Sequence, residues 1–128
     1  MAALDGSESA RPFLPAKDFE LSRAFYEALG FAKLLDSDVA IFSVGRSEFI
    51  LQNYYVEAWA SNFMMQLLVD DLDGWWAHIE ALDLPTAFGV AAPRAPAMQP
   101  WGLRVAYVFD PSGVLWHVAQ RRTDAAAD

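Results

Sequence analysis

Cysteine is absent from the 128 residues of this sequence. Disulfide scaffolds, zinc fingers, thiol nucleophiles and cysteine-bound iron–sulfur clusters are therefore excluded. Basic residues are scarce as well, because nine Lys and Arg stand against 17 Asp and Glu, for a net charge of −8. This charge repels phosphate backbones, and only Arg121 and Arg122 are adjacent in the sequence. No nucleic-acid partner is expected.

Long apolar runs are also missing, since no stretch approaches the ~20 residues that a membrane-spanning helix needs. The first residues include neither a basic segment nor an apolar one of the secretory type, so we expect a cytoplasmic protein without a membrane partner. The length suits one domain that folds without disulfide or metal. We expect this domain over 12–121, with flexible tails at 1–11 and 122–128.

The pattern of apolar residues predicts five elements in the first half of the chain. A strand over 12–17 ends at Asp18, a favourable N-cap residue, and an apolar stripe of helical period then continues to Gly30. Three strands follow, over the ranges 31–36, 39–44 and 48–54. The turn Gly45–Ser47 separates the last two as a hairpin. The order is β-α-β-β-β.

The second half repeats this order. A strand over 63–69 precedes a helix that begins after Asp71 and ends before Pro85. A short strand is predicted over 86–90, a loop over 91–100, and a final hairpin over 103–109 and 114–120. The two N-cap residues, Asp18 and Asp71, lie 53 residues apart. The sequence therefore predicts an α+β fold of two tandem modules, over 12–55 and 62–121.

Two stretches carry a family resemblance. "DFELSRAFYEALGF", which starts at Asp18, and "QPWGLRVAYVFDPSGVLWHVAQ", which starts at Gln99, resemble the signatures of the vicinal oxygen chelate superfamily of glyoxalases, dioxygenases and bleomycin-resistance proteins. The "PWG", the "DP-x-G" and the His of the last strand are most similar to the bleomycin-resistance branch. The resemblance implies paired modules whose curved sheets form a cleft, in a homodimer.

Strand alternation predicts which side chains face this cleft. In the first hairpin, pairing of Phe42 with Phe49 places one apolar face against the helices, and the open face then carries Val39, Ile41, Ser43, Glu48, Ile50 and Gln52. In the strand over 63–69 the open face carries Met64, Gln66 and Leu68, and Phe13 is the counterpart of Gln66 in the first module. In the last hairpin, pairing of Tyr107 with Trp116 leaves Arg104 and His117 on the open face.

The resemblance also implies four positions at which metal-dependent members carry His, Glu or Gln. Here they are occupied by Arg11, Ile50, Met64 and His117. Only His117 is suited to coordinate a divalent cation. If the assigned strand alternation were wrong by one residue, Gln52 or Gln66 would become a possible metal ligand, and the set of ligands would still be poor. No metal, other cofactor or catalytic residue is therefore expected.

The leading hypothesis is a non-enzymatic, dimeric protein that binds and sequesters a planar or aromatic, drug-like molecule. Trp101 either stacks on this ligand or closes the end of the sheet, and His117 either orients the ligand or is a satisfied, partly buried histidine. The alternatives are a metal-dependent lyase, isomerase or dioxygenase, and an interaction module whose cleft is filled by its own side chains. The predicted ligand-binding residues are Phe13, Val39, Ile41, Ile50, Gln52, Met64, Gln66, Leu68, Trp101, Arg104 and His117.

Overall fold

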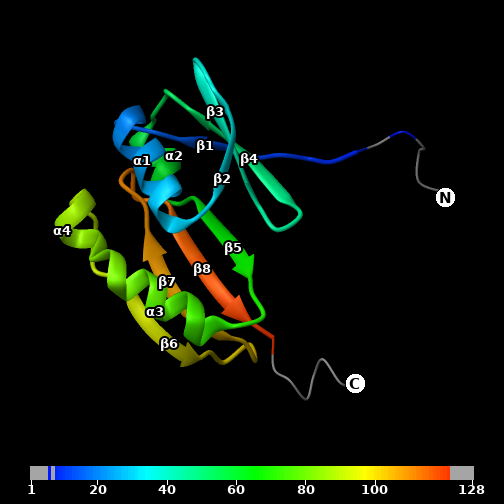
Figure 1. The fold of residues 1–128 in the computed structure, drawn as a ribbon, viewed down its shortest axis with the longest axis vertical. Coiled ribbons are helices and arrows are strands. Elements are labelled where there is room, and N and C mark those ends of the chain that lie inside the picture. Colours follow the sequence, from blue (N-terminus) through cyan, green and yellow to red (C-terminus); the bar gives the residue numbers. More distant parts are fainter. Residues whose placement is uncertain (1–5, 7, 122–128) are drawn as a thin grey trace.

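The computed structural model describes residue 6 and residues 8–121. In chain order its elements are β1 (Phe13–Pro15), α1 (Phe19–Leu29), β2 (Ala32–Asp36), β3 (Val39–Val44), β4 (Ser47–Gln52), α2 (Glu57–Ala60), β5 (Met64–Leu68), α3 (Leu72–Leu82), α4 (Leu84–Phe88), β6 (Arg94–Met98), β7 (Arg104–Phe109) and β8 (Leu115–Gln120) (Figure 1). The predicted tails fall largely outside the described residues, and residues 8–12 form neither helix nor strand.

Two four-stranded sheets share one topology. Their strand orders are β1-β4-β3-β2 and β5-β8-β7-β6. In each sheet the first strand runs parallel to the last strand of its module, and the remaining pairs are antiparallel. This correspondence confirms the predicted α+β fold of two β-α-β-β-β modules.

The two long helices start as the sequence predicts. The Asp18 carboxylate accepts a hydrogen bond from the backbone N–H of Leu21 (3.1 Å), and Asp71 accepts one from Gly74 (3.0 Å). Each bond satisfies an N–H group that has no partner within its helix. Gly30 ends α1 with a φ of 106°, a conformation that glycine adopts without strain.

Two predictions for residues 86–100 are wrong. Residues 84–88 form α4 rather than a strand, because Pro85 lies in the first helical turn, where its missing N–H is not needed. Residues 94–98 form β6 rather than a loop. A strand tolerates Pro96 there because β6 is an edge strand whose pairing with β7 is irregular between Arg94 and Ala97. The short helix α2 was not predicted either.

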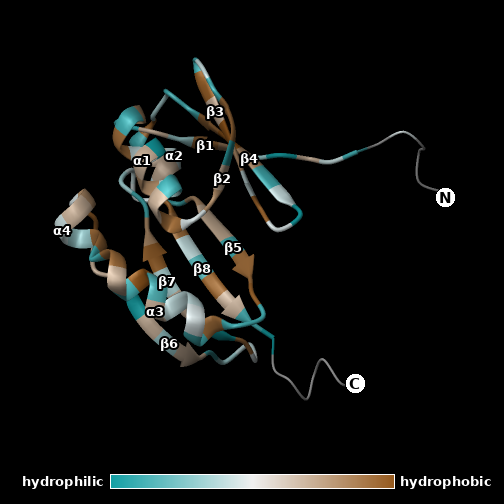
Figure 2. Cartoon of the chain, viewed as in Figure 1, coloured by the Kyte–Doolittle hydropathy of each residue, from teal (hydrophilic) through white to brown (hydrophobic). Residues whose placement is uncertain are grey.

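One face of each sheet packs against the helices. Leu72 and Ile79 of α3 are buried with Trp116 and Val118 of β8 in the core, and Figure 1 shows α3 running along this side of the second sheet. The strands β3, β5, β7 and β8 carry hydrophobic residues on both faces of their sheets (Figure 2), so the face opposite the helices is also partly apolar. None of the helices in the described part of the chain has the length and apolar character to cross a membrane.

A buried hydrogen-bonded cluster joins the two modules. The Tyr26 hydroxyl of α1 donates to the Asp110 carboxylate (2.6 Å) and accepts from the indole N–H of Trp116 (3.0 Å). The other Asp110 oxygen accepts from the backbone N–H groups of Ser112 (2.8 Å) and Val114 (2.9 Å). Burial raises the pKa of Asp110, and burial together with the Asp110 charge raises the pKa of Tyr26 well above its usual value.

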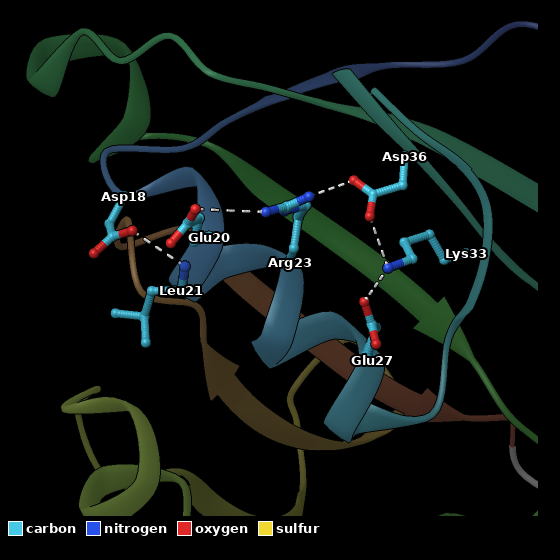
Figure 3. A network of polar contacts seen from close by, with 7 residues as sticks. All are labelled: Asp18, Glu20, Leu21, Arg23, Glu27, Lys33 and Asp36. Atoms are coloured by element: carbon cyan, nitrogen blue, oxygen red, sulfur yellow. Dashed lines mark hydrogen bonds and ion pairs between the residues drawn. The ribbon is translucent and has the colours of Figure 1, made fainter. Parts of the chain in front are cut away.

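Ion pairs attach the exposed edge strand β2 to α1 (Figure 3). Lys33 contacts Glu27 (2.6 Å) and Asp36 (3.0 Å), and Asp36 also pairs with Arg23. Hydrogen bonds from Lys33 and then Arg23 lower the pKa of Asp36. Because these groups are exposed to solvent and salt, each ion pair adds little to the free energy of unfolding. Together the pairs link the edge strand β2 to α1.

Removal of the Tyr26 hydroxyl tests the cluster that joins the modules. We expect Tyr26→Phe to lower the unfolding free energy by about 1.5–3 kcal/mol in urea titrations, because Asp110 and the Trp116 indole then lose a buried partner. Tyr107→Phe is the matched control, since Tyr107 is only partly buried, and its effect should stay within about 0.5 kcal/mol. Equal effects of the two variants would contradict the assignment.

The pKa shift of Asp110 predicts a pH dependence. Because the folded-state pKa is raised, the folded protein binds more protons than the unfolded one between the two pKa values. The stability contributed by Asp110 is therefore present below the ordinary aspartate pKa and is lost as the pH rises through the folded-state pKa. We expect the stability of the wild type relative to Asp110→Asn to fall as the pH rises above the ordinary aspartate pKa of about 3.9. A relative stability that grows with pH would show that hydrogen bonding outweighs burial.

Candidate functional site

The open face of the first sheet is largely apolar. Its hairpin has the predicted register, with Phe42 opposite Phe49 and both side chains buried on the helix side. The open face therefore carries Val39, Ile41, Ile50 and Gln52, as predicted. Phe13 of β1 pairs with Ile50 and is 55% exposed. A large aromatic side chain thus extends into solvent from the open face of β1.

The open face of the second sheet carries a polar row between apolar ones. Gln66 of β5 is aligned with His117 of β8, and Tyr107 of β7 lies opposite His117. Met64 and Leu68 occupy the same face on either side of Gln66, as predicted, and Met64 is 61% exposed. The structure thus brings together the sequence-predicted residues of β5 and β8.

The predicted phase of β7 is wrong by one residue. The Asp110 backbone N–H donates to the Val114 carbonyl, so the turn contains three residues, 111–113, and Tyr107 pairs with His117 rather than with Trp116. Arg104 therefore lies on the helix side, where it forms an ion pair with Asp73 of α3 (2.7 Å), and not on the open face. Tyr107 takes a place on the open face that the sequence reasoning missed. The sequence signal for this register is a three-residue hairpin loop whose last residue is a glycine in the left-handed backbone conformation. Gly113 has this conformation, with a φ of 89°.

Three rings form an aromatic corner, defined here as Trp101, Tyr107 and His117. The Tyr107 ring meets the imidazole edge-on at 4.9 Å between centroids, and the Trp101 ring is tilted over the imidazole at 6.4 Å. Trp101 remains 56% exposed. Burial lowers the pKa of His117, so the imidazole is neutral at neutral pH. The corner presents flat, weakly solvated surfaces on which a planar molecule can stack.

The site residues do not suit a metal ion. The partner of His117 across the strands is Gln66, and the equivalent pair of the first sheet is Phe13 and Ile50, which have no ligating atoms. The guanidinium of Arg11 is bound to Glu48 (3.1 Å). Within the described residues, no three His, Cys, Asp or Glu side chains gather as a metal site. These four paired positions thus supply one imidazole and one amide, which is too weak a combination to hold a divalent cation.

A groove of about 520 Å³ adjoins the open face of the second sheet. It lies between the β3–β4 turn at Gly45 and the end of β5. Its lining combines Gln66, Leu68, Trp75 and other apolar residues with the charged Arg46, Asp70 and Asp71. Its volume falls in the range of small-molecule sites. A larger hollow, of about 770 Å³, lies at the start of α1 and is lined mainly by charged and polar residues, so it offers little apolar contact. The groove beside Gln66 is therefore the better candidate.

The comparisons with known proteins agree with this geometry. The family model described as Glyoxalase/Bleomycin resistance protein/Dioxygenase superfamily matches residues 9–118. A bleomycin resistance protein of Klebsiella pneumoniae is 30% identical over 118 residues, which cover 89% of this chain and 93% of that protein.

Two solved structures resemble the fold closely. A bleomycin-binding protein complexed with bleomycin has a TM-score of 0.75 and 30% identity, over 91% of this chain and 100% of that one. A transposon-encoded bleomycin resistance determinant has a TM-score of 0.72 and 28% identity, over 91% and 99% of the two chains. The duplicated modules, the two signature stretches and these matches give one conclusion: the chain belongs to the glyoxalase/bleomycin resistance protein/dioxygenase superfamily, also called the vicinal oxygen chelate superfamily.

Proposed function

We propose that this protein binds and sequesters a planar or aromatic, drug-like small molecule on the open faces of its sheets, without chemical change of the ligand. The observation that carries the proposal is the aromatic corner, in which the exposed Trp101 stands over His117. Gln66, the neighbour of His117 on β5, lines the ligand-sized groove. Relatives of about 30% identity that are named for bleomycin binding or resistance support it. The mechanism is mass action, since a bound drug is withheld from its target.

A second copy of the chain is part of this proposal. Many of the large apolar side chains that the structure leaves exposed lie on the two open faces, and exposed apolar patches of this kind mark interfaces or ligand grooves. These residues are Phe13, Leu35, Met64, Leu68 and Trp101. In a homodimer, the open face of one copy supplies a second wall for the face of the other. Size-exclusion chromatography coupled to light scattering tests whether the protein is a dimer. We also propose a cytoplasmic location, which cell fractionation tests.

Binding is favoured over the two alternatives by specific features. A metal-dependent lyase, isomerase or dioxygenase needs an ion to polarise its substrate, and the residues at the expected positions do not fit one. A module whose cleft is filled by its own side chains would offer no ligand-sized space, whereas the groove beside Gln66 measures about 520 Å³. The accessible open faces and the adjoining groove therefore favour ligand binding over both alternatives.

Truncation of Trp101 tests the stacking contact. With bleomycin as the probe, we expect Trp101→Ala to raise the dissociation constant about tenfold in isothermal titration calorimetry, because the ligand loses an aromatic surface. Met98→Ala is the matched control: Met98 is 58% exposed, and its partner Arg104 places it on the helix side of the same sheet. It should bind like the wild type. An unchanged affinity of Trp101→Ala, with the fold intact, would refute the assignment.

Metal removal separates binding from metal-dependent catalysis. After exhaustive dialysis against EDTA, we expect the affinity for metal-free bleomycin to change by less than about twofold, because no ligand contact on the open faces depends on an ion. The melting temperature of the free protein should also be unaffected by added divalent cations. A large loss of affinity that Zn²⁺, Mn²⁺ or Ni²⁺ restores would return the enzyme hypothesis to first place.

A further inference from the structure

The polar row on the second sheet continues beyond the aromatic corner. Gln66 aligns with His117, His117 lies opposite Tyr107, and Tyr107 lies opposite Arg94 of the edge strand β6. One row across all four strands thus presents an amide, an imidazole, a phenol and a guanidinium. Apolar residues flank it on both sides, with Met64, Leu115 and Phe109 in one direction and Leu68, Ala119 and Val105 in the other. A flat ligand on this face meets hydrogen-bonding groups along a single line.

The charge on this face differs from that of the whole chain. The chain has a net charge of −8, yet none of the residues of β5 to β8 that share the open face is acidic. On the open face of the first sheet, the carboxylate of Glu48 is bound to Arg11. No acidic group in the described part of the chain lies within ion-pair distance of Arg94, which is exposed. Arg94 is therefore the charged residue among the strand residues that share this face, and the carboxylates of Asp70 and Asp71 line the neighbouring groove beyond the end of β5.

We propose that Arg94 is a specificity-determining residue that selects a planar ligand with an anionic oxygen group, such as an aromatic carboxylate. The inference deepens the proposed function and rests on it. Arg94 lies two strands from His117, roughly 10 Å away at ordinary strand spacing, which is about the length of a fused aromatic ring system. A ring stacked at the aromatic corner therefore places its far substituent at the guanidinium. Guanidinium groups bind carboxylates through two parallel hydrogen bonds.

The neighbouring groups strengthen this selectivity. His117 is held neutral by burial, so at neutral pH Arg94 is the only cation of the row. The Gln66 amide and the Tyr107 hydroxyl add neutral hydrogen-bonding groups, which orient a ligand without favouring either sign of charge. A cationic ligand would instead approach an unpaired guanidinium and find no carboxylate on the strands of this sheet face. Local charge thus opposes the preference that the net charge alone suggests.

Three fluorescent probes with one ring system test the inference: 1-pyrenecarboxylate, 1-pyrenemethanol and 1-pyrenemethylamine. Binding is measured from pyrene and tryptophan fluorescence at 0.15 M salt, where long-range charge effects are partly screened. We expect the wild type to bind the carboxylate about tenfold more tightly than the amine. Arg94→Gln should remove this preference and leave the affinity for the neutral alcohol unchanged. Arg104→Gln is the matched control, because that guanidinium lies on the opposite face, bound to Asp73.

Each outcome has one meaning. A preference for the amine, or a carboxylate preference that survives Arg94→Gln, overturns the role of Arg94 while the proposed function stands. Binding of none of the three probes, together with no binding of bleomycin, overturns both proposals. Binding of bleomycin without any pyrene probe would overturn the inference alone, because the face then fails to accept an isolated planar ring. Circular dichroism of both variants excludes loss of fold as the cause.

Discussion

The hydroxyl group of Tyr26 makes the contact on which the relative placement of the two modules depends. It comes from α1 of the first module, and its partners, Asp110 and Trp116, belong to the last hairpin of the second. Asp110 also closes its own turn through two backbone N–H groups, so one carboxylate fixes both the hairpin and the module junction. A buried carboxylate is costly unless each of its oxygens is hydrogen-bonded, and here each is. Around this cluster the aromatic rings of both modules pack edge-on or stacked, including Phe31 and Phe49 against Trp116.

This arrangement determines which faces of the sheets stay accessible to solvent. The helices and the junction use the inner face of each sheet, so the outer faces keep their apolar and aromatic side chains in contact with solvent. The same strand that contributes Trp116 to the junction presents its neighbour His117 to the open face, because successive side chains alternate. The junction therefore supports the aromatic corner directly: any shift of β8 along its neighbours would move Trp116 out of the core and His117 out of the row at the same time.

The sequence allowed most of the fold to be predicted because its local signals agree with one another. The caps Asp18 and Asp71 and the apolar stripes of α1 and α3 gave both helices, and the short turn at Gly45 gave the correct register of the first hairpin. The prediction failed for β7 because the residue that begins the turn, Asp110, is also a paired strand residue, and this shifted every side chain of the strand to the other face. As a result Arg104 lies on the helix side of the sheet and Tyr107 lies on the open face, the reverse of the prediction.

The placement of charge could not be predicted from composition. An excess of acidic residues suggests attraction of cations, but that argument applies to the long-range field and weakens beyond about 10 Å at moderate salt. A bound ligand experiences the groups within contact distance instead. The strand residues on the open face of the second sheet are neutral or basic, Asp70 and Asp71 line the groove at its edge, and on the first sheet the carboxylate of Glu48 is paired with Arg11. Sequence composition thus describes how a ligand approaches the protein, whereas strand register decides which charge the ligand meets after it has arrived. In this fold the single turn at Asp110 sets which side chains of β7 reach the open face, and the net charge carries no information on that placement.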